Sequence, residues 1–209
     1  ASKEDETGAN TKTYGHVTIN ISGGTIGNEN ATGDGAKYSG NVFGGSMGRL
    51  NLLDGTRNPI WPKMAQVKET NVNIYGTAVV RRSVYGGGEL GTVRDDAYVT
   101  IGGQKTHDAD ANGDVTVETK SGTPTIRRDV YGGGYGSEDR NYTIFTIPEL
   151  ISTNPDTYES HTYAFTPMQF AGCVGKNTYV NVVGGYIRKS VYGGGEMASV
   201  GVINYRAAD

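Results

Sequence analysis

The chain has 209 residues, 33 of them glycine, and a formal net charge of −3 at pH 7. This length fits one domain or one segment of a repeat array. The weak negative charge gives no electrostatic reason to expect a nucleic-acid partner. No apolar run approaches the ~20 residues that a membrane-spanning helix needs. The polar start, residues 1–13, is expected to be flexible.

One five-residue phrase, V-Y-G-G-G, dominates the sequence. It occurs three times, and a looser copy, V-F-G-G, stands earlier in the chain. The paired valine and aromatic residues are Val42 and Phe43, Val84 and Tyr85, Val130 and Tyr131, and Val191 and Tyr192. Self-similarity of this kind is the signature of a repeat architecture.

A second phrase, a short alternating apolar run that ends in glycine, recurs beside the first. Its last apolar residues are Ile21, Ile74, Ile101 and Val182. The intervals are 74 − 21 = 53, 101 − 74 = 27 and 182 − 101 = 81 residues, close to two, one and three times 27. This spacing predicts a coil of about 27 residues in which some rungs are weakly marked or replaced by insertions.

The pattern within one repeat predicts short strands. Thr70 to Gly76 alternates apolar and polar residues, and Ser83 to Tyr85 and Leu90 to Val93 are further short runs. Glycines allow the sharp corners between them. We therefore predict an all-β fold, a right-handed parallel β-solenoid forming a single domain over 1–209. The alternative is a β-prism, with antiparallel strands and threefold symmetry.

Stacked coils would place equivalent side chains about 4.8 Å apart. Phe43, Tyr85, Tyr131 and Tyr192 would then form an aromatic ladder, partly covered, and the four valines would line the core. Insertions are expected at about 49–68, 104–122 and 136–170. Repeat proteins usually place such loops on one edge of the stack. Trp61 and Tyr163 lie in two of them and are candidates for contact with a ligand, or for a lid over the stack.

Repeats of the form VxIxGGxI…xVYGGGxxG resemble those of large secreted, adhesin-like β-solenoid proteins on the surface of Gram-negative anaerobes. The resemblance covers most of the chain outside the three insertions. It implies an extracellular or cell-surface location and a binding or structural role, with a glycan or a host or bacterial surface protein as partner.

One insertion contains a pattern typical of calcium loops. Acidic or amide residues alternate, followed by glycine, as in the first part of an EF-hand loop. The candidate ligands are Asp108, Asp110, Asn112, Asp114 and Glu118. Position 12 of the loop is Thr119 where a bidentate glutamate would stand, and Asn112-Gly113 is also a strong hairpin signal. Calcium binding and a plain solvated turn both remain open.

A pair of basic residues precedes each full copy of the main phrase. The pairs are Arg81 and Arg82, Arg127 and Arg128, and Arg188 and Lys189. Stacked on one corner they would form a positive stripe able to hold an anionic glycan. The alternative is a solvated corner whose charge is balanced by neighbouring carboxylates.

The sequence offers little for catalysis. It has no Gly-x-Ser-x-Gly elbow, phosphate loop or Cys/His cluster, and its three histidines fall at unrelated places in the repeat. We expect a non-enzymatic binding or structural protein that contacts its ligand through the insertion loops. The alternatives are a polysaccharide lyase-like or hydrolase-like β-helix enzyme, and a structural segment that associates end to end.

Overall fold

The computed structural model describes residues 15–28, 39–49, 65–138 and 171–201 in full. It also gives the backbone of four outlying strands: β1 (Ser2–Glu4), β2 (Asn10–Lys12), β14 (Thr143–Leu150) and β15 (Tyr158–Phe165). All regular structure in these residues is β. None of it forms a helix that could cross a membrane.

Three parallel four-stranded sheets form the body of the protein. Sheet I contains β3 (His16–Ile21), β6 (Glu69–Ile74), β9 (Ala97–Ile101) and β16 (Thr178–Val182). Sheet II contains β4 (Thr25–Ile26), β7 (Val79–Val80), β12 (Thr125–Ile126) and β17 (Tyr186–Ile187). Sheet III contains β5 (Val42–Phe43), β8 (Val84–Tyr85), β13 (Val130–Tyr131) and β18 (Val191–Tyr192).

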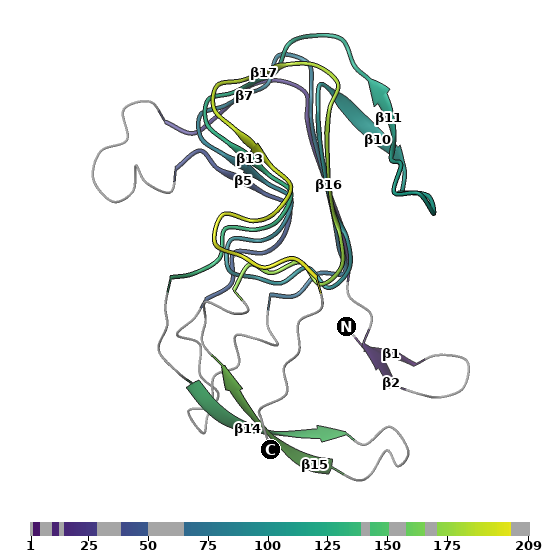
Figure 1. Cartoon of the computed structure of the whole chain (residues 1–209), viewed down its shortest axis with the longest axis vertical. Coiled ribbons are helices and arrows are strands. Elements are labelled where there is room, and N and C mark those ends of the chain that lie inside the picture. Colours follow the sequence, from purple (N-terminus) through teal and green to yellow (C-terminus); the bar gives the residue numbers. More distant parts are fainter. Residues whose placement is uncertain are drawn as a thin grey trace.

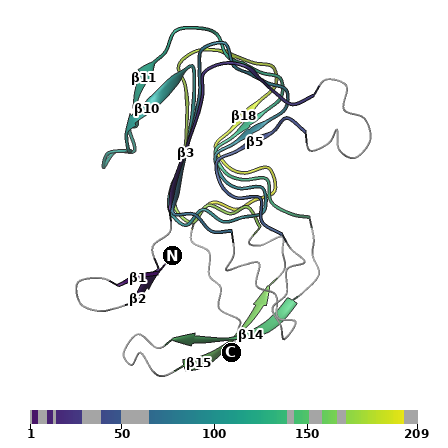
Figure 2. The ribbon, with the colours of Figure 1, turned by 180° about the vertical axis from the view of Figure 1, so that it is seen from behind.

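The chain passes through sheets I, II and III in the same order four times. We call each pass a level, so that β3, β4 and β5 make level 1 and β16, β17 and β18 make level 4. The levels lie one over another, and their traces nearly superpose in the views of Figures 1 and 2. Because the sheets are parallel, the β-prism alternative is wrong.

Residues with the same place in the repeat are hydrogen-bonded neighbours. Ile21 pairs with Ile74, Ile74 with Ile101, and Ile101 with Val182. The intervals of 53, 27 and 81 residues therefore each separate adjacent levels, and no weakly marked rung lies between them. The excess over 27 residues is inserted sequence, such as the hairpin of β10 (Gly103–His107) and β11 (Thr116–Thr119).

The core is a narrow strip enclosed by the three sheets. It consists of Val42, Val72, Ile74, Ala78, Val80, Val84, Val99, Ile101, Ile126 and Val130. The prediction that the phrase valines of levels 1–3 face inward is thus confirmed, although Val191 of level 4 is 46% exposed. Burying aliphatic side chains in one shared strip lets a polar chain with few hydrophobic residues gain hydrophobic stabilisation.

The predicted aromatic ladder is present in sheet III. The ring centroids are 4.7 Å apart for Phe43 and Tyr85, 4.9 Å for Tyr85 and Tyr131, and 5.0 Å for Tyr131 and Tyr192. The rings are nearly parallel, with interplanar angles of 15°, 4° and 10°. Tyr85 is only 2% exposed, so the inner rings are covered more completely than predicted. We call these four residues the tyrosine stack.

The predicted strand at Leu90 to Val93 is reduced to a single bridging residue. Val93 pairs with Val67 on one side and with Val174 on the other, and Val174 pairs with Val200. Beside this column lies the buried thiol of Cys173, whose pKa burial raises to about 11. A buried thiol with a raised pKa packs as a small apolar group and is not a reactive nucleophile.

The triple-glycine turn after sheet III brings the backbones of adjacent levels into close contact. Gly44 donates to the Tyr85 carbonyl and Gly86 to the Tyr131 carbonyl, both at 2.9 Å. A Cβ on Gly44, Gly86 or Gly132 would lie closer than 3.0 Å to the carbonyl oxygen of the matching glycine in the next level. Real Cβ atoms essentially never come so close. Glycine is therefore required here by close backbone approach.

Replacement of Gly132 by alanine is expected to destabilise the protein by about 3 kcal/mol or more, because the added methyl group overlaps the Gly193 carbonyl. Chemical denaturation followed by circular dichroism measures the loss. The matched control is Gly193→Ala, since a Cβ at Gly193 meets no atom within 4 Å. Equal stability of the two variants would contradict the close approach.

Candidate functional site

A tyrosine–carboxylate contact links the tyrosine stack to the turn that follows level 4. The Tyr85 hydroxyl donates a 2.5 Å hydrogen bond to Oε2 of Glu196, and the Tyr135 ring lies edge-on to Tyr85 at 6.0 Å. Burial, and next the bonded carboxylate of Glu196, raise the pKa of Tyr85 far above its ordinary value. Burial likewise raises the pKa of Tyr131. Both phenols are therefore neutral donors at physiological pH.

A depression of about 460 Å³ lies beside Tyr135. Its lining residues are Met47, Glu89, Leu90, Tyr135, Gly136, Ser137, Glu138 and Met197. Met47, which is 62% exposed, supplies apolar surface to this lining. Partial burial raises the pKa of the Glu89 carboxyl above its ordinary value. The depression thus combines apolar surface, an aromatic ring and carboxylates.

The place of the depression in the chain is informative. Met47 lies just before residues 50–64 and Glu138 just before residues 139–142, which fall in two of the predicted insertions. The lining comes from levels 1, 2, 3 and 4, so the sequence alone could not assemble it. The sequence contains one indication of this site. The residue after the triple glycine varies between Glu89, Tyr135 and Glu196 while the glycines before it do not.

The three basic pairs stand at equivalent places in levels 2, 3 and 4. Each pair directly follows a strand of sheet II, and those strands are paired in register through Val80, Ile126 and Ile187. Arg127 donates its backbone N–H to Val80 and Arg188 donates to Ile126. Arg128, Arg188 and Lys189 are exposed, whereas Arg81, Arg82 and Arg127 are half-buried. The pairs share one corner, and anion binding there stays a prediction.

The predicted calcium loop connects β10 to β11. The Asp110 carboxylate accepts the backbone N–H groups of Asn112 and Asp114, at 2.8 and 3.0 Å. Both bonds lower the pKa of Asp110, and the bond from Asp114 has the larger effect. The Glu118 carboxylate pairs with Lys120 at 2.6 Å. In the part of the chain that the structure describes, no three acidic, histidine or cysteine side chains gather as a metal site would require.

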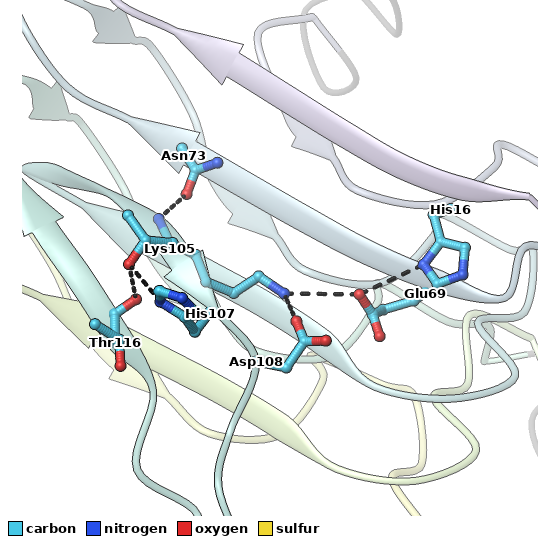
Figure 3. Close-up of polar contacts among 8 residues, drawn as sticks. His16, Glu69, Asn73, Lys105, His107, Asp108 and Thr116 are labelled. Carbon is cyan, nitrogen blue, oxygen red and sulfur yellow. Dashed lines mark hydrogen bonds and ion pairs between the residues drawn. The ribbon is translucent and has the colours of Figure 1, made fainter.

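A charged cluster holds the β10–β11 hairpin on the outer face of sheet I (Figure 3). The Lys105 ammonium pairs with Asp108 and, at 3.6 Å, with Glu69, and it lies 3.6 Å above the centre of the Tyr98 ring. Its backbone N–H donates to Asn73 at 2.9 Å. The Lys105 side chain is only 7% exposed. The sequence pattern gave no indication of this cluster, because it joins residues from separate levels.

The hairpin explains an anomaly in sheet I. Tyr98 alternates with the inward-facing Val99 and points outward, yet it is 2% exposed because β10 covers it. Figures 1 and 2 show β10 and β11 on the side of sheet I away from the other two sheets. Tyr98 also stacks on Tyr179 of level 4, with centroids 4.9 Å apart. Burial raises the pKa of Tyr98 to about 12.

Three further carboxylates, those of Asp95, Asp96 and Asp129, join adjacent levels. Asp96 accepts the backbone N–H of Asn177 at 2.9 Å, and Asp129 accepts that of Ser190 at 3.1 Å. Asp95 pairs with Lys176 at 3.2 Å. These contacts give the three carboxylates structural roles.

Two predicted contact residues cannot be placed. Trp61 lies outside the described residues. Tyr163 lies in β15, opposite Phe145 of β14, and its side chain is outside the description. Their proposed contact with a ligand remains a prediction from the sequence.

Alkaline titration should reveal the buried phenols. The unfolded chain loses phenolic protons near pH 10, whereas Tyr98 does so near pH 12 and Tyr85 and Tyr131 require still higher pH. The native state is therefore fully favoured below about pH 10 and loses stability as the pH rises through the folded-state values. Phenolate absorbance should rise together with loss of the β circular-dichroism signal. Titration of every tyrosine with a pKa near 10 while the fold stays intact would contradict the burial of these phenols.

Replacement of Lys105 by methionine should destabilise the protein by about 1.5–3 kcal/mol, since it leaves half-buried carboxylate and tyrosine groups without their cation. The matched control is Lys120→Met on the same hairpin, where the pair with Glu118 is more exposed and worth about 0.5 kcal/mol. Urea denaturation compares the two variants. An equal effect would mean that Lys105 does not anchor the hairpin.

Comparison with known proteins finds no family model, no curated protein and no solved structure that matches this chain. Its function has therefore to be inferred from its own geometry.

Proposed function

We propose that the chain is a right-handed parallel β-solenoid of the extracellular or cell-surface, adhesin-like kind, and that it binds glycans without catalysing their breakdown. Three features support the solenoid: the parallel sheets, the constant order of sheets I, II and III, and the short strands. Right-handedness follows the general chirality of parallel crossovers.

The observation that carries the binding proposal is the depression around Tyr135. A sugar ring has an apolar face, which suits an aromatic ring or a thioether, and hydroxyl groups, which suit carboxylates. Tyr135, Met47 and Met197 supply the first kind of contact, while Glu89 and Glu138 supply the second. Because the carboxylates outnumber the cations here, the depression favours neutral or amino sugars over uronates.

The position of the depression, beside two predicted insertions in the sequence, also suits ligand binding. Backbone hydrogen bonds between levels fix the heights of Glu89, Tyr135 and Met197, as when the Met197 N–H donates to the Tyr135 carbonyl. Each residue lies one or two positions after the triple glycine of its level. Rigid placement of contact residues lowers the entropy lost on binding. Loop sequence beside such a platform can vary without disturbing it, which is how many binding proteins separate recognition from folding.

The proposal predicts glycan binding that depends on Tyr135. A glycan array probed with the wild-type chain should reveal binding to neutral or amino sugars, and Tyr135→Ala should weaken it roughly tenfold or more. Arg128→Ser is the matched control, since Arg128 is an exposed residue of the basic corner. It should leave binding unchanged. Each array is run with calcium and with chelator, which tests the loop at Asp108.

The outcomes separate the candidate surfaces. Loss of binding in Arg128→Ser with no loss in Tyr135→Ala would transfer the site to the basic corner and favour an anionic polymer. A blank array would overturn glycan binding and favour a protein partner. Cleavage of a bound glycan would overturn the non-enzymatic assignment.

A further inference from the structure

We propose that the exposed end formed by level 4 is an acceptor for level 1 of a second copy of this chain, so that copies associate head to tail. The inference rests on the stacking of levels in the proposed solenoid and is independent of glycan binding. Three observations carry it, namely the glycines of level 4, its unpaired backbone donors and its exposed apolar side chains.

The first two glycines of the level 4 turn, Gly193 and Gly194, have no contact that accounts for them. In levels 1 to 3, the first glycine of the turn is required because the matching carbonyl of the next level fills the space of a Cβ. Gly193 stands in the same register position, yet a Cβ there or at Gly194 would meet nothing within 4 Å. Level 4 thus has the residue types of an inner level. Another level, stacked above Gly193 at the strand spacing, would explain why glycine is needed at this position.

Backbone hydrogen bonds lead to the same conclusion. In each lower level, the phrase valine and the first two glycines donate to carbonyls of the next level, as Val42 does to Ser83 at 3.0 Å. Within the described residues, the N–H groups of Val191, Gly193 and Gly194 have no such acceptor. Unpaired donors along a strand edge are a template for an added strand.

Level 1 offers the matching acceptors. Continuing the register would place Asn41 of the second copy over Ser190, Val42 over Val191, and Phe43 over Tyr192. The carbonyls of Asn41, Phe43 and Gly45 would then receive the three free N–H groups. In the described part of the chain, these carbonyls accept no backbone hydrogen bond. The two ends are therefore complementary in donors and acceptors.

The side chains of the two ends match as well. Level 4 exposes Val182 (50%), Tyr186 (57%), Val191 (46%) and Tyr192 (47%), all large apolar groups. In register, Ile21 would lie over Val182 and Ile26 over Ile187, so the core strip would continue across the junction. Phe43 would extend the tyrosine stack by one ring. A back-to-back arrangement of two level 4 ends would make the strands antiparallel and lose this register.

Head-to-tail contact uses different surfaces on each copy, so it does not close at a dimer. The weight-average mass measured by sedimentation should therefore keep rising with concentration from low micromolar to millimolar. Gly193→Ala should weaken the association roughly tenfold or more, because its methyl group would overlap the Gly44 carbonyl of the incoming copy. Its monomer should keep wild-type stability, since the methyl group enters open space.

The matched control is Gly15→Ala, which also adds a methyl group in open space. Its register equivalents in levels 2 to 4 are Lys68, Asp95 and Lys176, which carry side chains within the stack. This variant should associate like the wild type. Equal association by Gly193→Ala would overturn the proposal.

Cross-linking tests the register directly. Two singly substituted proteins, Asn41→Cys and Ser190→Cys, are made in a Cys173→Ala background. Adjacent levels lie about 4.8 Å apart, within the Cα separation that a disulfide spans. On oxidation, only the mixture of the two should give a disulfide-linked dimer, and adding Gly193→Ala to the Ser190→Cys protein should abolish it.

Two results would contradict head-to-tail association. Dimers of Ser190→Cys alone would overturn the head-to-tail arrangement in favour of back-to-back contact. A wild-type chain that stays monomeric at every concentration, with no mixed cross-link, would overturn association between copies. Neither result would bear on the glycan array.

Discussion

The fold depends on backbone contact between levels at the triple-glycine turn. There the carbonyl of one level occupies the space that a Cβ of the level before would need, and amide groups on both sides bond at about 2.9–3.1 Å. This contact fixes the vertical register. Once register is fixed, side chains with the same place in the repeat must stack, because a slip by one residue would turn every valine of the core outward. The tyrosine stack and the aliphatic core are consequences of that one constraint.

A register held by glycine frees other parts of the chain to vary. Between β9 and β12 the polypeptide leaves the level, forms the β10–β11 hairpin and returns in register. The hairpin is attached by polar contacts of Lys105 with Glu69 and Asn73, from level 2. It covers Tyr98, an aromatic residue on the face of sheet I that would otherwise be wet. Insertions in this protein can thus contribute packing as well as surface for a ligand.

The architecture could be predicted from local sequence patterns, whereas contacts between residues far apart in the sequence could not. The valines and aromatic residues could be assigned to opposite faces because period-two alternation and repeated phrases are local signals. The prediction of extra coils between the marked ones is wrong, because inserted sequence lengthens two of the intervals to near multiples of 27 residues. The contact of Tyr85 with Glu196 joins residues 111 apart, and the depression draws on all four levels. Such sites become visible only when register places distant residues together.

The two ends of the stack carry chemistry of their own. Repeat proteins that end at a terminal repeat usually give it a polar outer face, because an exposed apolar level would recruit other chains. Level 4 does the opposite, with Val191 and Tyr192 each nearly half exposed and glycine retained at 193 and 194. The residues instead meet the requirements of a further level, which is why we assign this end to association between copies and the proposed glycan site to the separate depression around Tyr135.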